Sequence, residues 1–337
     1  MLRLLLGRAG TGKTTSILRQ IAASGGTRRQ LLIVPEQASH ETERRLCAVG
    51  GNQVSLYAEV LSFTRLGSRV LAQAGGLAAP TLDPGGRLLL MYAALKSVSN
   101  ALTVYARPSR KPAFLSGLLA TLDECKQYCV TPEALANAGQ ETGGQEGDKL
   151  KDLGLIFGAY DALTARVAAD PRDRLTRLAQ GLAECGYARG MSVYVDGFTD
   201  FTPQQLLVLR KLLLQAEEVT VALTCGRLSG EENEGGIFRP ARRTAARLLR
   251  LAQEVGVPSE TVYSLEYKGR KAESLVRLEK NLFADLPQIH PEPAREITLF
   301  SAVTPRSELE WTASEILRLI REEGFRFREI AVAARGF

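Results

Sequence analysis

Histidine is scarce in this chain, and paired cysteines are absent from it. Only His40 and His290 occur among the 337 residues, so a histidine-based zinc site has almost no ligands to draw on. The five cysteines include no C-x-x-C pair, and an odd number of scattered thiols is typical of a reducing compartment. Cys125 and Cys129 stand one helical turn apart. A shared metal is one interpretation of that spacing, and a pair of small buried apolar residues is the favoured one.

Long apolar runs are absent as well. No stretch is long enough to span a bilayer, and the apolar residues 1–6 are too few for a secretory signal, so we expect a cytoplasmic protein with no membrane contact. The hydrophobic share of 45% and the charged share of 24% describe a soluble globular chain. Its 337 residues exceed one ordinary domain and predict two or three packed units.

Aromatic residues make up only 6% of the chain, and none interleaves with its basic clusters, so no base-stacking groove is indicated. The net charge of +6 still permits an anionic partner. Taken alone, each basic cluster is expected to be a solvated surface. The clusters are Arg107, Arg110 and Lys111; Arg239, Arg242, Arg243 and Arg247; and Lys268, Arg270 and Lys271.

Residues 7–14 have the spacing G-x-x-x-x-G-K-T and directly follow a strand-like apolar opening. Glycines let such a turn wrap a phosphate chain with its backbone N–H groups facing inward, and an adjoining helix N-terminus adds favourable charge. Lys13 would reach the β- and γ-phosphates, and the Thr14 hydroxyl would bind Mg²⁺. A merely flexible turn is the alternative, but the Lys-Thr pair at this offset argues against it. The predicted ligands are ATP and Mg²⁺, and the predicted nucleotide contacts are Gly7, Gly10, Gly12, Lys13, Thr14 and Thr15.

A second element of a nucleotide site is the carboxylate of Asp196, which follows the apolar residues 193–195. A phosphate-binding turn normally works with an acidic residue at the end of a neighbouring strand, where it holds Mg²⁺ directly or through water. A plain turn former is the alternative reading. ATP-hydrolysing helicases usually have a glutamate next, whereas this chain has Gly197, and Asp200 is the nearest acidic substitute. The sequence therefore predicts nucleotide binding with weak or no hydrolysis, and no catalytic residue is assigned.

The pattern beyond the turn predicts an α/β domain built on a parallel sheet. The continuous apolar run of residues 30–34 is typical of a buried parallel strand. Helices are expected from Phe63 and from Thr202, where Thr202 and Gln205 form a capping box. Further strands are predicted at residues 53–57, 192–195 and 219–223.

Residues 83–190 differ in character, because leucine-rich segments recur there at helical spacing with few strand-like runs between them. This pattern predicts an all-helical insertion. Within it, the polar, glycine-rich residues 139–147 are too hydrophilic to fold alone and predict a mobile loop.

The end of the chain repeats the strand and helix alternation. Strands are predicted at residues 297–300 and 329–333, with a helix between them that starts at a capping box of Ser307 and Glu310. Such a small unit cannot cover both faces of its own sheet, so we expect a truncated domain. The alternative is that these elements complete the first domain's sheet.

Several separated segments together resemble the AddB subunit of bacterial AddAB helicase–nucleases. The most discriminating is the Asp-Gly-Phe variant of the acidic motif at residues 196–198. The resemblance spans the whole chain but only the N-terminal third of that family's length. The matching segments are residues 7–14, 32–37, 194–199, 201–202 and 329–335.

The resemblance implies a superfamily-one-helicase-like core and a role in processing double-strand DNA ends for recombinational repair, together with an AddA-type partner subunit. Single-stranded DNA would pass the segment after the second strand, which makes Gln37, Ser39 and His40 candidates for DNA contact. Capping and solvation of a helix start is the equal alternative for these three residues. The implied domains are a first RecA-like domain (1–82 and 191–290), a helical insertion (83–190) and the start of a second RecA-like domain (294–337).

Two parts of the family pattern have no counterpart in this chain. The carboxylate-and-lysine nuclease site and the cysteines of the iron–sulfur cluster are missing, so neither nuclease activity nor the cluster is assigned to it. The arginine that completes the ATP site from the second RecA-like domain is missing too, and such residues contribute factors of roughly 10³ to 10⁵ in rate. The resemblance implies one part of an ATP-dependent helicase–exonuclease complex. A self-contained P-loop phosphotransferase and a nucleotide-regulated interaction module are the alternatives.

Overall fold

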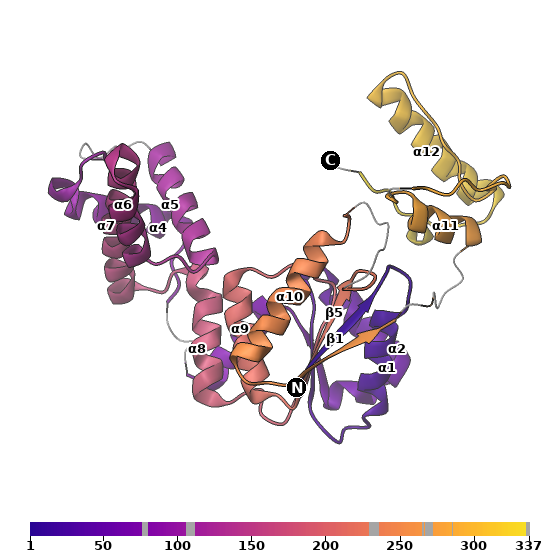
Figure 1. Ribbon diagram of the computed structural model, residues 1–337, viewed down its shortest axis with the longest axis horizontal. Coiled ribbons are helices and arrows are strands. Elements are labelled where there is room, and N and C mark those ends of the chain that lie inside the picture. The colour runs from indigo at the N-terminus through magenta and orange to yellow at the C-terminus, as the bar shows by residue number, and fades with distance from the viewer. Residues whose placement is uncertain are drawn as a thin grey trace. The chain divides into compact units, whose positions relative to one another are not determined.

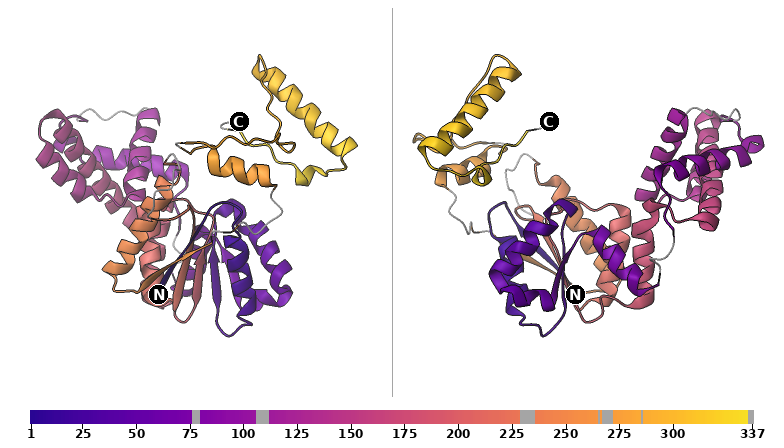
Figure 2. Two further views of the ribbon diagram at one scale, coloured as in Figure 1. Left: turned by 45° about the vertical axis from the view of Figure 1, so that its right-hand side comes forward. Right: turned by 180° about the vertical axis from the view of Figure 1, so that it is seen from behind.

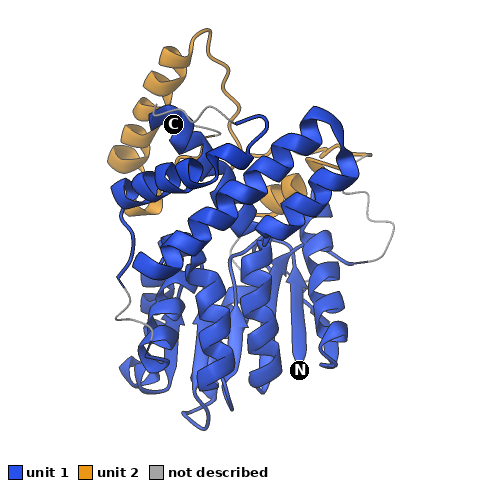
Figure 3. Cartoon of the chain, turned by 90° about the vertical axis from the view of Figure 1, so that its left-hand side faces the viewer, with its two compact units in different colours: residues 1–270 blue, residues 271–337 orange. Residues whose placement is uncertain are grey.

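A computed structural model describes residues 1–75, 80–105, 112–228, 236–264, 266, 272–284 and 286–334. They form two compact units, which Figure 3 distinguishes by colour: residues 1–270 and residues 271–337. The first unit holds a parallel sheet, the helices that cover it and a separate group of helices (Figure 1). The predicted α/β class is therefore confirmed. The basic clusters at residues 107–111 and 268–271, and Arg335, lie outside the described residues.

The sheet has six strands in the order β3-β2-β4-β5-β1-β6, and all its neighbours pair in parallel. Because β4 and β5 lie between β2 and β1, the chain leaves the sheet after β3 and returns to its centre, as the sequence predicted. The carboxyl ends of parallel strands meet at one edge, so the ends of β1 and β4 lie on the same edge. The strands are β1 (Leu2–Gly7), β2 (Gln30–Ile33), β3 (Ala58–Leu61), β4 (Ser192–Val195), β5 (Glu218–Thr224) and β6 (Ser259–Tyr263).

Helices cover both faces of the sheet (Figure 2). Alternate strand residues point to opposite faces and give two apolar cores, one on each side. On one face Ile17 and Leu46 pack against Leu32. On the other face Leu178 and Leu248 join Leu4. The first face carries α1 (Lys13–Ala23) and α2 (Ser39–Gly50), and the second carries α3 (Phe63–Gln73), α8 (Arg174–Cys185), α9 (Pro203–Gln215) and α10 (Arg239–Glu254).

The remaining helices of the first unit form a group with a core of its own around Phe157 and Tyr160. The predicted helical character of this part of the chain is confirmed, whereas α8, at the end of the predicted insertion, packs on the sheet against α3 and α9. The domain boundaries themselves stay predictions. Among the described residues, no helix combines the length and apolarity needed to cross a membrane. The group consists of α4 (Pro84–Ser97), α5 (Pro112–Gln127), α6 (Pro132–Thr142) and α7 (Gly144–Val167).

The predicted mobile loop at residues 139–147 was wrong, because this stretch comprises the end of α6, a one-residue connection and the start of α7. Gly143, with φ of 64°, makes the turn between the two helices. Gly139 and Gly147 have no side chains to separate the helices, so the two backbones touch there. A Cβ on Gly147 would lie 2.4 Å from the Gly139 carbonyl oxygen. The polar composition reflects solvent exposure around a glycine contact rather than the absence of structure.

The strand predicted at residues 53–57 was also wrong. That segment is a 3₁₀ turn, η2 (Asn52–Leu56), and the strand begins two residues later at Ala58. Leu56 is 86% exposed, so the apolar pattern did not mark a buried strand. The pairing of Gln30 with Ala58 sets the register of β3 against β2.

In the second unit, the described residues contain no strand, and the strands predicted at residues 297–300 and 329–333 are not formed. A strand needs a neighbour to pair its backbone groups, and Leu299 is instead 97% exposed. The helix between them starts earlier than predicted, because Thr304 rather than Ser307 caps it and accepts a hydrogen bond from the Ser307 N–H at 3.1 Å. The elements are α11 (Glu273–Asn281), α12 (Pro305–Glu322) and η5 (Phe327–Glu329).

Candidate functional site

The turn between β1 and α1 depends on three of its glycines. Gly10 and Gly12 have φ of 85° and 83°, a region that residues with a Cβ rarely adopt. Gly7 is needed for another reason, since a Cβ there would lie 2.4 Å from the Ser264 carbonyl oxygen just beyond β6. The Ser264 hydroxyl in turn donates to the Thr11 carbonyl at 2.7 Å. The glycine spacing therefore follows from the shape of the turn.

The first turn of α1 is open to an anion. Its N-cap is Gly12, which supplies no side-chain acceptor, and no acidic residue lies in the first turn. The leading backbone N–H groups of a helix have no partner within the helix, and the helix dipole adds partial positive charge there. Phosphate and carboxylate groups bind at such ends.

Lys13 is held inside the turn. Its side chain is buried, and its ammonium donates to the carbonyls of Gly7 at 2.6 Å and Arg8 at 3.0 Å. Burial lowers the pKa of Lys13, and the negative charge of Asp196 opposes that shift. An ammonium group has three donors, so one remains for a ligand in the turn.

Asp196 and Thr14 lie side by side although 182 residues separate them. The Thr14 hydroxyl donates to Asp196 Oδ2 at 2.6 Å. Asp196 is fixed at the end of β4, because its backbone N–H donates to the Ile33 carbonyl at 3.0 Å and its Oδ1 accepts from the Gly197 N–H at 2.9 Å. A hydroxyl and a carboxylate oxygen that converge in this way match the oxygen ligands that Mg²⁺ prefers.

A cavity of about 500 Å³ opens over this pair. Five of the six predicted nucleotide contacts line it together with Asp196, and Gly7 lies behind them as an acceptor for Lys13. Asp200, the acidic substitute considered from the sequence, is not among the lining residues. It accepts from the Thr244 hydroxyl at 3.0 Å and from Arg247 at 3.2 Å instead. The lining contacts are Gly10, Gly12, Lys13, Thr14 and Thr15.

Sequence reasoning missed one charged residue of this cavity, Arg45 on α2. No motif marks it, because it stands 32 residues after Lys13 in an ordinary amphipathic helix. The only sequence signal was its place on the helix that directly follows the second predicted strand.

The three candidates for DNA contact lie where the chain leaves β2. Gln37 belongs to a 3₁₀ turn, η1 (Glu36–Ala38), and is exposed, as is His40. Ser39 is buried, and its hydroxyl donates to the Glu36 carbonyl at 2.9 Å. The backbone thus already uses the Ser39 hydroxyl, whereas Gln37 and His40 face solvent.

The cysteines form no metal site in the described part of the chain, where no group of three or more His, Cys, Asp or Glu side chains converges. The expectation of a buried pair was wrong for Cys129, which is exposed just beyond α5 with φ of 58°. Desolvation raises the pKa of both the Cys125 and Cys129 thiols, so both are protonated at neutral pH.

Comparison with known proteins agrees with this architecture. Residues 4–279 match the family described as ADDB, N-terminal. Proteins named as the B-type subunit of an ATP-dependent helicase/deoxyribonuclease are similar to the chain over 98–99% of its length, and the chain spans about 30% of theirs. The identity is 35% over 343 residues in Thermoanaerobacter pseudethanolicus, 37% over 348 in Desulforudis audaxviator and 32% over 344 in Clostridium tetani. As the sequence resemblance predicted, the chain belongs to the AddB family and matches its N-terminal part.

Proposed function

We propose that this chain is the N-terminal, helicase-like part of the AddB-type subunit of an ATP-dependent helicase/deoxyribonuclease, and that it binds ATP with Mg²⁺. The observation that carries the proposal is the hydrogen bond of 2.6 Å between Thr14 and Asp196, which brings the start of α1 to the end of β4. Thr14 and Asp196 would hold the ion, and Lys13 with the open N–H groups of α1 would hold the phosphates. When bound, Mg²⁺ supplies positive charge that neutralises the β- and γ-phosphates.

Weak hydrolysis is part of the proposal. Gly197 follows Asp196, and Asp196 is the only carboxylate among the described residues that line the cavity. Asp200 is held by Thr244 and Arg247. A water molecule in the cavity would therefore lack a general base supplied by this part of the chain.

The wider role follows the relatives' names, which describe one subunit of a helicase and deoxyribonuclease. We infer a partner subunit of the AddA type, DNA ends as substrate, and a cytoplasmic role in double-strand break processing for recombinational repair. The exposed Gln37 and His40 beside β2 are the side chains available for single-stranded DNA. The net charge of +6 favours this anionic partner.

Lys13→Ala is expected to weaken the binding of ATP with Mg²⁺ by about tenfold or more, because charge-assisted hydrogen bonds to the phosphates are lost. Isothermal titration measures the change. The control is Arg19→Ala, which removes an exposed charge from the same helix away from the cavity. Equal affinity in wild type and Lys13→Ala would refute the phosphate-binding role of the turn.

Single-stranded DNA is expected to bind the full-length protein, alone or with its partner subunit, with an affinity that falls as salt rises. Fluorescence anisotropy of a labelled oligonucleotide, repeated at several salt concentrations, tests this. Absence of binding in both forms would contradict the helicase-like role and favour a nucleotide-regulated interaction module. A phosphorylated small-molecule product would instead favour a phosphotransferase.

A further inference from the structure

The cavity over Thr14 and Asp196 contains one arginine among its described lining residues, Arg45. Within the described residues its guanidinium has no carboxylate partner, whereas the preceding Arg44 forms an ion pair with Glu41 at 3.3 Å. The two neighbouring arginines on α2 thus differ in surroundings: one lies on the cavity and the other on the outer surface of the helix.

The position of Arg45 is set by buried neighbours. Leu46, the next residue, is 2% exposed and packs in the same core as Ile17 of α1. Thr42, one turn earlier, is buried as well. Since these contacts fix α2 against α1, the side chain of Arg45 starts from a rigid element and reaches the cavity from a defined side.

The order of the sheet links α2 to the strand before Asp196. α2 follows β2, and β2 pairs directly with β4, which ends just before Asp196. β1, which leads into the glycine turn, is separated from β4 by β5. Arg45 thus stands on the helix after the strand that neighbours β4, and it lines the same cavity as Thr14 and Asp196. In the proposed binding mode Thr14 and Asp196 would hold the ion, and its positive charge would offset the negative charge of the terminal phosphates.

We propose that Arg45 binds the terminal phosphate of a nucleoside triphosphate, so that this site distinguishes ATP from ADP. The inference rests on the proposed nucleotide site and deepens it. A planar guanidinium donates two parallel hydrogen bonds to phosphate oxygens, which an ammonium group cannot do. ADP lacks the phosphate that Arg45 contacts, so the arginine contributes to the affinity for the triphosphate alone.

The test compares two nucleotides on the full-length protein. Isothermal titration with Mg²⁺ measures the affinity for ADP and for a non-hydrolysable ATP analogue in wild type, Arg45→Ala, Arg45→Lys and Arg44→Ala. For Arg45→Ala we expect the affinity for the analogue to fall about tenfold or more, while that for ADP changes less than about twofold. Arg45→Lys should recover only part of the loss, and Arg44→Ala should match wild type.

Two results would overturn the inference while leaving the proposed site intact. One is an equal loss of affinity for both nucleotides in Arg45→Ala, which would show a general charge effect. The other is unchanged affinity for the analogue. Failure of the proposed function looks different, because wild type itself would then bind neither nucleotide. Circular dichroism melting of each variant establishes that it is folded.

Discussion

Asp170→Ala is expected to lower the free energy of unfolding by about 3 kcal/mol, because it removes the central carboxylate of a buried ion network, leaves a buried hydroxyl and a backbone N–H without their acceptor, and takes one partner from each of two cations. The Asp170 side chain is 0% exposed. Urea unfolding followed by circular dichroism measures the change. The effect should be among the largest for any single polar residue of this chain.

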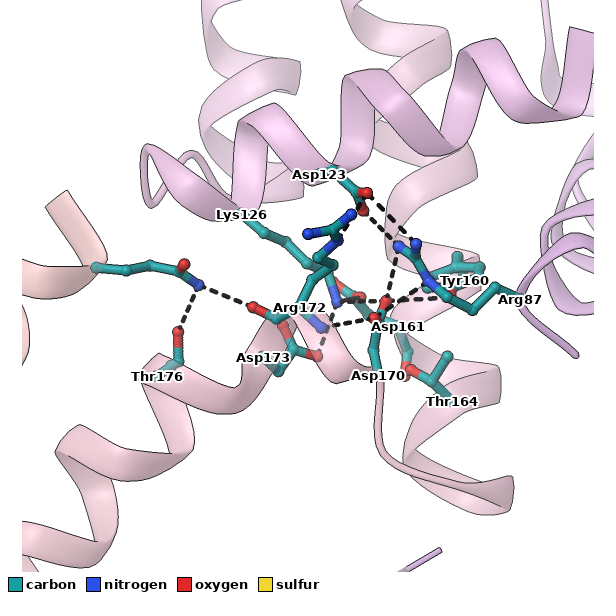
Figure 4. A network of polar contacts seen from close by, with 11 residues as sticks. Arg87, Asp123, Lys126, Tyr160, Asp161, Thr164, Asp170, Arg172, Asp173 and Thr176 are labelled. Carbon is teal, nitrogen blue, oxygen red and sulfur yellow. Dashed lines mark hydrogen bonds and ion pairs between the residues drawn. The ribbon is translucent and has the colours of Figure 1, made fainter. Parts of the chain in front are cut away.

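Figure 4 shows the polar groups that surround the Asp170 carboxylate and their contacts with it. Asp170 lies 3.2 Å from Arg87 Nε and 3.3 Å from Lys126 Nζ. It also accepts hydrogen bonds from the Tyr160 hydroxyl at 3.1 Å and from the Arg172 backbone N–H at 2.9 Å. Removal of the carboxylate would strand the buried Tyr160 hydroxyl as well as weaken two ion pairs.

The pKa of Asp170 makes the loss of stability in Asp170→Ala depend on pH. Burial alone would raise this pKa, but the Arg172 N–H and the charges of Lys126 and Arg87 outweigh burial and hold it below its ordinary value of 3.8. A lowered pKa contributes stability that is present above the ordinary value and is lost as the pH falls through the folded-state value. The difference in the free energy of unfolding between wild type and Asp170→Ala should therefore shrink below about pH 4.

Asp161→Ala is the matched control. Asp161 also faces Lys126, at 3.2 Å, but its side chain is 42% exposed. An exposed pair contributes little, so we expect a change of about 1 kcal/mol or less. If Asp170→Ala proved no more destabilising than Asp161→Ala, the network would not be the stabilising junction that its burial indicates.

The network also joins the helical group to the sheet. Arg87 and Lys126 belong to α4 and α5, whereas Asp170 lies beyond α7, just before α8. From α9, Gln204 donates to the Arg172 carbonyl at 3.1 Å and to the Thr176 hydroxyl at 3.2 Å. Polar contacts thus run from the helical group to the helix that follows the Asp196 segment.

Most residues predicted for the candidate site lie together in the structure because the geometry of the turn is encoded locally. The glycines at positions 7, 10 and 12 are required by one turn, and Lys13 and Thr14 follow it directly. Asp196 is remote in sequence, but it ends an apolar strand, and parallel strands bring such ends to one edge. General strand geometry was therefore enough to place it near Thr14.

Features that depend on long-range packing were not predictable in this way. Arg45 lines the cavity from α2, which packs on α1, and Arg87 meets Asp170 across 83 residues. No local sequence pattern predicts either contact. The strands predicted at residues 297–300 and 329–333 had a local pattern but did not form. Apolar alternation forms a strand only where a pairing partner exists.

Gly147→Ala is expected to destabilise the protein by about 3 kcal/mol, because the new methyl group would collide with backbone rather than with a flexible side chain. Its Cβ would lie 2.4 Å from the Gly139 carbonyl oxygen, so α6 and α7 would have to separate. Urea unfolding measures the loss, and hydrogen exchange should show faster exchange in α6 than in wild type.

Gly158→Ala on the same helix separates this contact from helix propensity. A Cβ there would meet only the Pro132 Cβ at 3.7 Å, an ordinary contact. Alanine favours a helix over glycine by about 1 kcal/mol, so this variant should equal or exceed wild type in stability. If Gly147→Ala were as stable as Gly158→Ala, α6 and α7 would not pack through a close glycine contact. Residues 139–147 would then be loosely packed, as their polar composition first indicated.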